Sequence, residues 1–294
     1  AFLQPGNYFE AGISVLDPTV SGTANANGST LADMGDDYYF PSAALKLQVT
    51  DHFSFGLLYD QPFGADATYS LTDPALSVTG EGLFRNTTES TAVEVKTQNL
   101  SMILGFQPTE NWNLYGGGVY QTVKGDVQLR GLAYGSTTAL GQYNANMKED
   151  GAAGWLAGFA YQIPEIALKA SATYRSKIKH DAATNEYGTS AVLRGNFNTV
   201  SSTEIETPQS VNLDFQSGIM ADTVAFANVR WVNWEDFSIR PSTFGAAANT
   251  IGLLGQGPIG GFDLVAYTDD QWSATAGVGR KLSEQWAGNV SVGW

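Results

Sequence analysis

Apolar and polar residues alternate with a period of two along much of this chain, in segments that are separated by turns. The clearest segment spans residues 166–179: its even positions from Ile166 to Tyr174 are apolar, whereas its odd positions from Lys169 to Lys179 carry hydroxyl or cationic groups. Successive side chains of a β-strand point to opposite faces, so this pattern predicts a strand with one apolar and one polar face. About eleven such strands are predicted, centred near Phe9, Tyr39, Phe53, Val93, Trp112, Trp155, Leu168, Val211, Val229, Ala276 and Val290.

The connections between these segments alternate strictly between short turns and long polar loops. The short turns fall at Thr50–His52, Gln107–Asn111, Pro164–Glu165, Ala221–Thr223 and Ser283–Gln285, and the long connections span roughly residues 17–37, 62–90, 125–150, 180–207 and 238–270. Strands joined by tight turns at one end and by extended loops at the other are typical of bacterial outer-membrane barrels.

The apolar faces have the length of strands that cross a bilayer, which takes about nine to eleven tilted residues. A charged side chain that faces lipid at the midplane costs about 2–4 kcal/mol, so the polar faces must line an interior. Aromatic residues mark both strand ends, as two membrane-surface girdles would: Phe53, Phe106, Trp112, Tyr161 and Trp286 lie beside short turns, and Trp155, Tyr174, Trp231 and Trp272 lie nearer the long loops. The sequence therefore predicts an all-β, transmembrane, antiparallel up-and-down β-barrel that forms a single domain over residues 1–294.

Composition narrows the possible functions. The 294 residues carry a net charge of −14, which argues against a nucleic-acid partner, and the absence of cysteine excludes disulfides and thiolate metal sites. The glycine-rich segment 255–260 fits a dinucleotide fingerprint by letter only, because Pro258 disfavours the turn into a helix. His52 and His180 are isolated, with no spacing that suggests a hydrolase. We therefore expect no enzyme activity, no metal and no cofactor.

Strand parity predicts that the barrel is incomplete. Single-chain bacterial barrels have an even number of strands and close without a free edge, since an unpaired edge in hydrocarbon costs several kcal/mol per backbone group. With short turns on the periplasmic side, the eleventh strand would end on the extracellular side. We therefore expect at least one further strand.

Several segments resemble the long-chain fatty acid transporters of the outer membrane, the FadL family. The resemblance lies in residues 53–65 (FSFGLLYDQPFGA), 172–176 (ATYRS), 207–211 (TPQSV) and 232–237 (VNWEDF), in the order of the family. It implies a barrel of roughly fourteen strands with a small N-terminal hatch in the lumen and a kinked third strand that opens the wall sideways. On that template this chain lacks the hatch and about three C-terminal strands.

The end of the third predicted strand is the candidate lateral gate. Pro62, Phe63, Gly64 and Ala65 follow the strand directly. Proline cannot donate to a strand ladder and glycine tolerates bends, so pairing is expected to break here. The same residues are also ordinary turn formers, and the segment fits the start of an extracellular loop equally well. The resemblance to the kinked strand of the family favours the gate.

A fatty acid requires an apolar slot and a cation for its carboxylate. Inward-phase cations are predicted at Lys124, Arg175, Lys177 and Arg230, and Lys124 lies in a strand resembling the one from which the family supplies such a cation. Lumenal charge balance with Asp214 and Glu94 is the alternative role for these cations. Apolar loop residues are further ligand-binding candidates, unless they pack the loops together as a lid: Leu132, Tyr134, Leu253, Leu254 and Phe262.

We therefore expect a monomeric protein of the bacterial outer membrane that passively transports long-chain fatty acids or other hydrophobic compounds. Its partners would be that small molecule and the surrounding lipid and lipopolysaccharide. The sequence leaves fatty acids and aromatic hydrocarbons as alternative cargoes, since both need the same apolar walls. A porin for polar solutes and a non-transporting structural or adhesin barrel stay open as alternatives.

Overall fold

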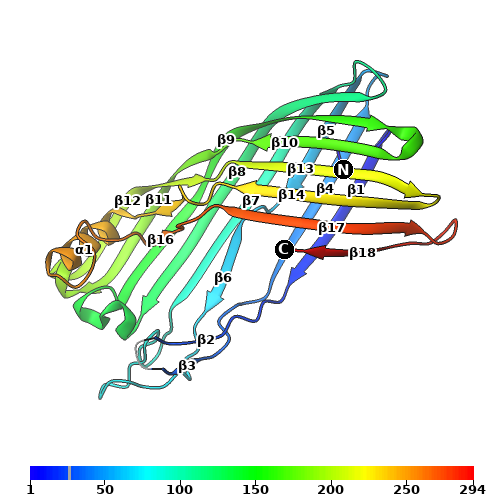
Figure 1. Ribbon diagram of the computed structural model, residues 1–294. Coiled ribbons are helices and arrows are strands. Elements are labelled where there is room, and N and C mark those ends of the chain that lie inside the picture. The colour runs from blue at the N-terminus through cyan, green and yellow to red at the C-terminus, as the bar shows by residue number, and fades with distance from the viewer. Residues whose placement is uncertain (26–27) are drawn as a thin grey trace.

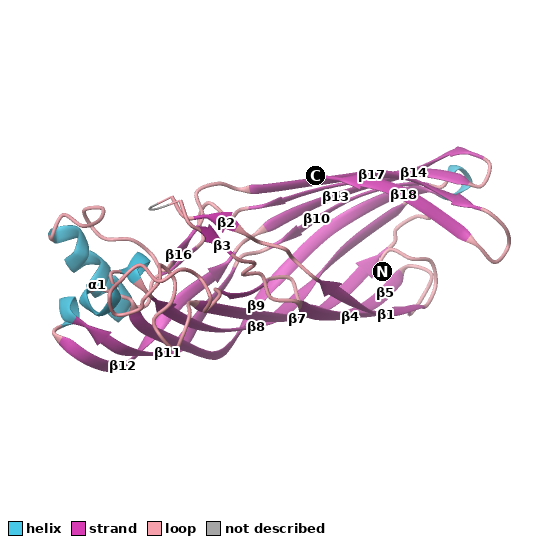
Figure 2. Ribbon diagram, turned by 90° about the horizontal axis from the view of Figure 1, so that it is seen from below, coloured by secondary structure: helices cyan, strands magenta, loops and turns pink. Residues whose placement is uncertain are grey.

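A computed structural model describes residues 1–25 and 28–294 and places all eleven predicted strands in one antiparallel sheet (Figure 1). The strands in sheet order are β1 (Tyr8–Leu16), β4 (Tyr38–Gln48), β5 (Phe53–Asp60), β7 (Ala92–Phe106), β8 (Trp112–Arg130), β9 (Gln142–Ile163), β10 (Leu168–Arg175), β13 (Ser210–Met220), β14 (Thr223–Val232), β17 (Gln271–Lys281) and β18 (Ala287–Gly293). Each strand pairs with the next along the chain. The sheet curls into a trough with β1 and β18 as its two edges (Figure 2).

Three more strands extend this sheet at one end. β6 (Gly64–Thr68) continues the line of β5 and pairs with β7, while β11 (Ile178–Ser190) and β12 (Gly195–Thr207) form a hairpin that pairs with the far half of β9. The smaller elements are the pairs β2 (Gly22–Thr23) with β3 (Thr30–Leu31) and β15 (Ser238–Ile239) with β16 (Val265–Ala266), the helix α1 (Ser242–Leu253), and 3-10 turns at Leu132–Tyr134, Ser136–Thr138, Pro164–Ile166 and Ala191–Leu193. In the described residues, no helix has the length and apolarity needed to cross a membrane.

The separation of loop lengths is confirmed: the short turns gather at one end of the sheet and the long connections at the other (Figure 1). The long connections are more ordered than predicted: residues 62–90 contain β6, and residues 125–150 contain the end of β8 and the start of β9. Residues 180–207 form most of the β11–β12 hairpin, and residues 238–270 contain α1. Of the predicted connection 17–37, residues 26–27 lie outside the described part of the chain.

The convex face of the sheet carries the predicted apolar surface and both aromatic girdles. At the short-turn end, Phe53 packs on Phe106 with ring centroids 5.1 Å apart, across the β5–β7 pair. At the other end, Trp155 packs on Tyr174 at 5.1 Å. Phe53, Phe106 and Trp155 are 54%, 41% and 53% exposed, so these rings lie on the surface instead of forming a core.

One predicted strand is wrong in its upper part. The segment 166–179 is not a single strand: β10 ends at Arg175 and the chain re-enters the sheet as β11 at Ile178. In β11 the even positions from Ile178 to Glu186 are buried, whereas Lys177 and Lys179 are exposed. The inside–outside phase therefore inverts at residues 176–177, and Lys177 is not an inward cation.

Two apolar clusters lie inside the trough. The larger one joins the far halves of β8, β9, β11 and β12 to α1, and includes Tyr143, Phe244 and Ile251. The smaller one surrounds Phe2, whose ring occupies space left by two wall glycines, Gly56 and Gly105. Residues 1–4 thus lie within the lumen.

Candidate functional site

The wall of the sheet is interrupted between β5 and β6. β5 pairs with β7 as far as Asp60 opposite Asn99, and β6 resumes the pairing with Gly64 opposite Lys96. Residues 61–63 therefore face only two residues of β7, and Pro62 has no N–H to offer a ladder. The break predicted from the sequence at Pro62–Ala65 is present as a bulged interruption of the strand.

The hydroxyl of Thr97 replaces the missing ladder at this break. The Phe63 backbone N–H donates to Thr97 Oγ1 at 3.0 Å, and the same hydroxyl donates to the Phe63 carbonyl at 2.6 Å. Thr97 is only 2% exposed, so both backbone groups of Phe63 would be left buried and unpaired without it. A single side chain therefore holds the bulge in place.

On its other side, the break leaves a window in the wall. The pairing of β4 with β5 begins at Ala43 opposite Tyr59 and continues toward the short turn. On the long-loop side of the break, an isolated bridge joins Gly35 to Ala67. In the described residues, no strand pairing joins β4 to the break between these two contacts. A groove of about 180 Å³ fills this window, lined by Tyr38, Phe40 and the segment 61–66.

An apolar cavity of about 170 Å³ lies on the lumenal side of the same segment. Its walls come from β7, β8, β9 and β12, through Val95, Val123, Met147 and Ile205 among others. Phe63, Gly64 and Ala65 line both this cavity and the outer groove. The segment 63–65 is therefore the partition between an apolar space inside the wall and a groove that opens through it.

Four aromatic rings close the cavity on the side of the loops. Phe63 meets Trp234 edge-on with centroids 5.2 Å apart, and Trp234 also contacts Phe237 at 5.1 Å and Tyr267 at 4.9 Å. Trp234, Phe237 and Tyr267 were not among the residues predicted for the site, although the segment 232–237 carries part of the family resemblance. Only the folded chain brings them to the break, since Trp234 is far from Phe63 in sequence.

Below the apolar cavity lies a small polar space of about 40 Å³. Asp60, Arg175 and Arg230 line it together with Phe63 and Thr207, which also line the apolar cavity. Arg175 donates to Ser101 Oγ at 3.4 Å, whereas Asp60 Oδ1 and Arg230 Nε are buried without a hydrogen-bond partner in the described structure. Two predicted inward cations, Arg175 and Arg230, thus converge on one point of the lumen.

The predicted lumenal position of Lys124 is wrong. In β8 the odd residues Val119 to Val127 are buried, while Lys124 and Asp126 are exposed on the outer face. Lys124 contributes to the border of the apolar cavity, but its side chain is on the opposite side of the wall from Arg175. This part of β8 lies beyond the apolar band, where the outer face meets water and the inner face is the apolar one.

The apolar loop residues lie apart from both cavities. Tyr134 packs edge-on against Phe84 at 5.9 Å, and burial raises its pKa to about 12. Phe262 packs on Phe244 of α1 at 5.6 Å. Leu253 and Leu254 are 84% and 60% exposed at the end of α1, and Leu132 lies in the first 3-10 turn beside Tyr134. Ligand contact by these residues stays a prediction.

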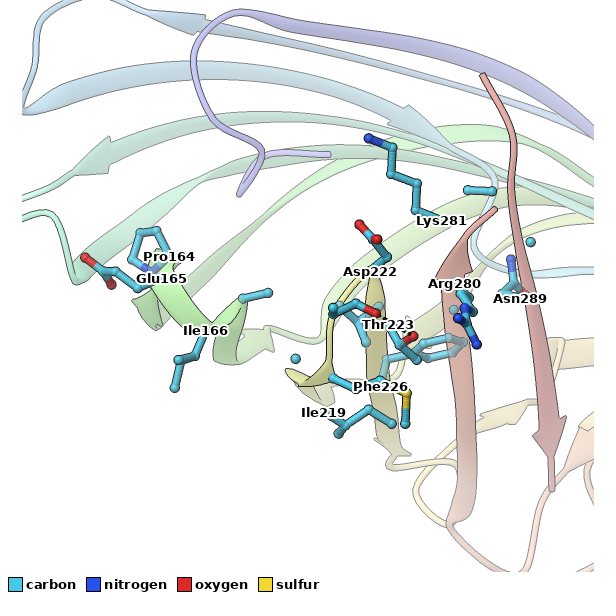
Figure 3. A pocket seen from close by; sticks show the side chains of 18 residues that line it. Pro164, Glu165, Ile166, Ile219, Asp222, Thr223, Phe226, Arg280, Lys281 and Asn289 are labelled. Carbon is cyan, nitrogen blue, oxygen red and sulfur yellow. Dashed lines mark hydrogen bonds between the residues drawn. The ribbon is translucent and has the colours of Figure 1, made fainter. Parts of the chain in front are cut away.

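Another cavity, of about 950 Å³, lies at the short-turn end between the ends of β13, β14, β17 and β18 (Figure 3). Asp222, Arg280 and Asn289 line it. It shares no lining residue with the spaces around the break. Its cations therefore serve as matched controls for those of the lumen.

A curved antiparallel sheet with an apolar convex face, two aromatic girdles and an apolar cavity beside a wall window defines an outer-membrane β-barrel of the hydrophobic-compound transporter class. The sequence matches the family model described as outer membrane protein transport protein (OMPP1/FadL/TodX) over residues 2–287. The chain belongs to this family, and it is an outer-membrane protein. A comparison with curated proteins gave no match.

Solved structures show the same fold. A FadL homologue of Pseudomonas aeruginosa is similar with a TM-score of 0.60 at 17% identity, over 98% of this chain and 70% of that one. The toluene transporter TodX of Pseudomonas putida gives 0.61 at 13% identity, over 100% and 76% of the two chains. The toluene transporter TbuX of Ralstonia pickettii gives 0.59 at 11% identity, over 99% and 78%.

Proposed function

We propose that this protein takes up long-chain fatty acids or other hydrophobic compounds passively, and that the cargo leaves sideways through the window at residues 62–65. The observation that carries the proposal is the shared partition: Phe63, Gly64 and Ala65 line both the lumenal apolar cavity and the outer groove. A small movement of this segment would join the two spaces. An apolar molecule would then pass from the lumen to the outer face of the wall at the membrane surface, from which the hydrophobic effect favours its burial in the bilayer.

The polar space below the cavity supports a carboxylate-bearing cargo. Two guanidinium groups, of Arg175 and Arg230, face the single carboxylate of Asp60 in this space. The Nε–H group of Arg230 is a hydrogen-bond donor without a partner in the described residues. A guanidinium in a desolvated site is well suited to bind a carboxylate. A fatty acid could therefore place its head against the arginines and its chain in the apolar cavity.

The cavity volume supports a second cargo class, small aromatic hydrocarbons. The inner cavity, of about 170 Å³, is close to a dry protein cavity of roughly 150 Å³ that binds benzene. One aromatic ring would fit within it, whereas a long acyl chain would also need the outer groove. The solved relatives TodX and TbuX are described as toluene transporters.

A binding titration of the full-length protein in detergent micelles separates these cargoes. A fluorescent long-chain fatty acid would be titrated, with toluene as the uncharged competitor. We expect saturable fatty-acid binding that Arg175→Met with Arg230→Met weakens by at least about tenfold, the cost of a lost charge-assisted contact. Arg280→Met, in the cavity at the short-turn end, is the control and should leave binding unchanged.

The outcome assigns the cargo. Weakened fatty-acid binding with unchanged toluene binding in the double variant would establish a carboxylate-reading transporter. If the double variant binds the fatty acid and toluene as tightly as wild type does, the arginines do not read the carboxylate, and the cargo is assigned to the hydrocarbon class. Absence of saturable binding by either ligand would overturn the proposed function.

A further inference from the structure

The outer face of the β7–β8 pair is stratified by chemistry. Because the two strands are antiparallel and in register, their outward residues form rungs. From the short-turn end upward the rungs are Phe106–Leu114, Leu104–Gly116, Met102–Gly118, Leu100–Tyr120, Gln98–Thr122, Lys96–Lys124 and Glu94–Asp126. The first four face lipid, the fifth is neutral and polar, the sixth carries two lysines and the seventh carries two carboxylates.

The lysine rung lies at the height of lipid headgroups. It stands four residues beyond Leu100 and Tyr120, which are the last apolar pair. At about 3.4 Å per residue and a tilt of about 40°, this is roughly 10 Å above the hydrocarbon edge. Tyr120 is 53% exposed, as an aromatic girdle residue at the membrane surface should be.

Two lysines directly opposite each other on antiparallel strands repel and destabilise the pair. Lys96 has an ion pair with Glu94 on the same strand, whereas Lys124 has none in the described residues. If these charges only balanced one another, a lysine opposite a carboxylate on each rung would neutralise them better. Instead the cations are sorted toward the membrane and the carboxylates away from it.

Three more lysines lie on the outer wall of the neighbouring segments, but carboxylates accompany them. At the register shift between Val123 and Gly125, Lys124 comes opposite Lys148 and Glu149 of β9, whose side chains are both exposed. Lys177 and Lys179 form ion pairs with Glu206 and Glu204 of β12. Of these five lysines, Lys124 and Lys148 have no ion pair in the described residues, and Lys124 lies directly opposite Lys96.

We propose that Lys96 and Lys124 bind the phosphate groups of lipopolysaccharide in the outer leaflet, with Lys148 beside them. A phosphate between the two ammonium groups would remove their repulsion and accept a charge-assisted hydrogen bond from each. The chemistry required is a phosphate monoester fixed at the membrane surface, which the phosphorylated lipid A headgroup supplies. The site adjoins the cargo spaces, since Lys96 lines the outer groove and Lys124 borders the apolar cavity, but the lipid-binding argument does not use the proposed transport.

The test adds purified lipopolysaccharide to the full-length protein in detergent micelles. The affinity is obtained from the shift of the melting temperature with lipid concentration. Lys96→Gln with Lys124→Gln is the test variant, and Lys281→Gln, an exposed lysine at the short-turn end, is the control. A lysine near an anionic surface contributes about 1 kcal/mol, so each substitution should weaken binding about fivefold and the pair about 25-fold. Lys281→Gln should bind like wild type.

Three ligand arms identify the source of the phosphate. Dephosphorylated lipid A should bind the wild type as weakly as intact lipopolysaccharide binds the double variant. Phosphatidylglycerol micelles and inorganic phosphate should bind more weakly than lipopolysaccharide. Unchanged lipopolysaccharide affinity in the double variant, or equal affinity for the dephosphorylated lipid, would overturn the proposal, and so would inorganic phosphate that binds as tightly as the lipid.

Both substituted side chains are exposed, so folding should be preserved. Circular dichroism and the heat-dependent gel mobility of the barrel check this directly. Because Lys96 lines the outer groove and Lys124 borders the apolar cavity, the double variant is judged by the lipid arms and not by fatty-acid binding.

Discussion

The hydroxyl of Tyr143 donates a 2.8 Å hydrogen bond to Glu186 Oε1, and both side chains are fully buried. The same carboxylate accepts the first backbone N–H groups of α1, from Thr243 at 2.9 Å and Phe244 at 2.7 Å. No side chain of the helix itself caps this end. Glu186 of β11 therefore caps a helix from another part of the chain and holds it over the far end of the lumen.

Glu186→Gln should loosen α1 without unfolding the barrel, because the amide offers one acceptor oxygen where two amide donors need one each. We expect the free energy of local opening of residues 242–253 to fall by about 1–3 kcal/mol. Hydrogen exchange of α1 measures this. Glu204→Gln, which removes an exposed ion pair with Lys179, is the control and should change exchange by less than about 0.5 kcal/mol. Equal protection of α1 in both variants would contradict the capping role.

Thr97→Val should destabilise the break at Phe63, since valine has the shape of threonine but no hydroxyl. Both backbone groups of Phe63 would lose their partner, at a cost of about 1–3 kcal/mol. We expect faster proteolysis at residues 61–66 and a leakier wall. Thr97→Ser keeps the hydroxyl and should behave like wild type. A valine variant with an unaltered break would show that the hydroxyl is dispensable there.

Gly64→Leu should slow uptake while the barrel stays folded. A Cβ at residue 64 meets its nearest atoms at 3.5 and 3.7 Å, on Val95 and Tyr38, so a side chain would fit and extend into the groove of the window. Because a long acyl chain needs that groove and a single ring does not, fatty-acid uptake should fall more than toluene uptake. Gly118→Leu, on the lipid-facing wall with open space around it, is the control. Identical uptake by the two variants would count against the lateral route.

The stability of the β11–β12 hairpin should decrease as the pH falls below about 6.5. Burial lowers the pKa of His180, and the nearby Asp150 carboxylate, 3.3 Å from Nδ1, only partly opposes this. The closed hairpin therefore favours the neutral ring, whereas the opened hairpin takes up a proton below its ordinary pKa of about 6.5.

Hydrogen exchange at pH 7.5 and pH 5.5 checks this, with lower protection of residues 178–207 expected at the lower pH. The effect is limited to about tenfold per pH unit. His180→Gln should remove the pH dependence because glutamine does not titrate. Protection that rises on acidification would mean that the pair with Asp150 outweighs burial.

The helix α1 shows one limit of sequence reading. Residues 242–253 contain no charged residue and no strong helical stripe, so the sequence predicted only part of a long loop here. Their helix is stabilised by Glu186 and by packing of Phe244 on Tyr143, with centroids 5.4 Å apart. Both partners lie on strands far away in the chain, so no local pattern could reveal them.

The lysines show a second limit. The inward position of Lys177 came from extending the period-two alternation of β10 past Arg175, where the phase inverts. Lys124 is an even residue of β8, and the continuous alternation of that strand puts even residues such as Tyr120 on the outer face. Within the bilayer the outer face is apolar, since lipid surrounds it, and Arg175 and Arg230 are correctly placed inside. Beyond the bilayer the outer face meets water, and the inner face at Val123 and Val127 becomes the apolar one.

The sequence by itself determined the eleven strands that pair in chain order, the two kinds of connection, the girdles and the break at Pro62–Ala65, because each depends on local period and turn chemistry. Only the tertiary structure decided which side chains share a space: Trp234 with Phe63, Arg175 with Arg230, and Lys96 with Lys124. These pairs are set by strand register and by the curvature of the sheet. Both arise from long-range pairing, which leaves no signal in any single segment.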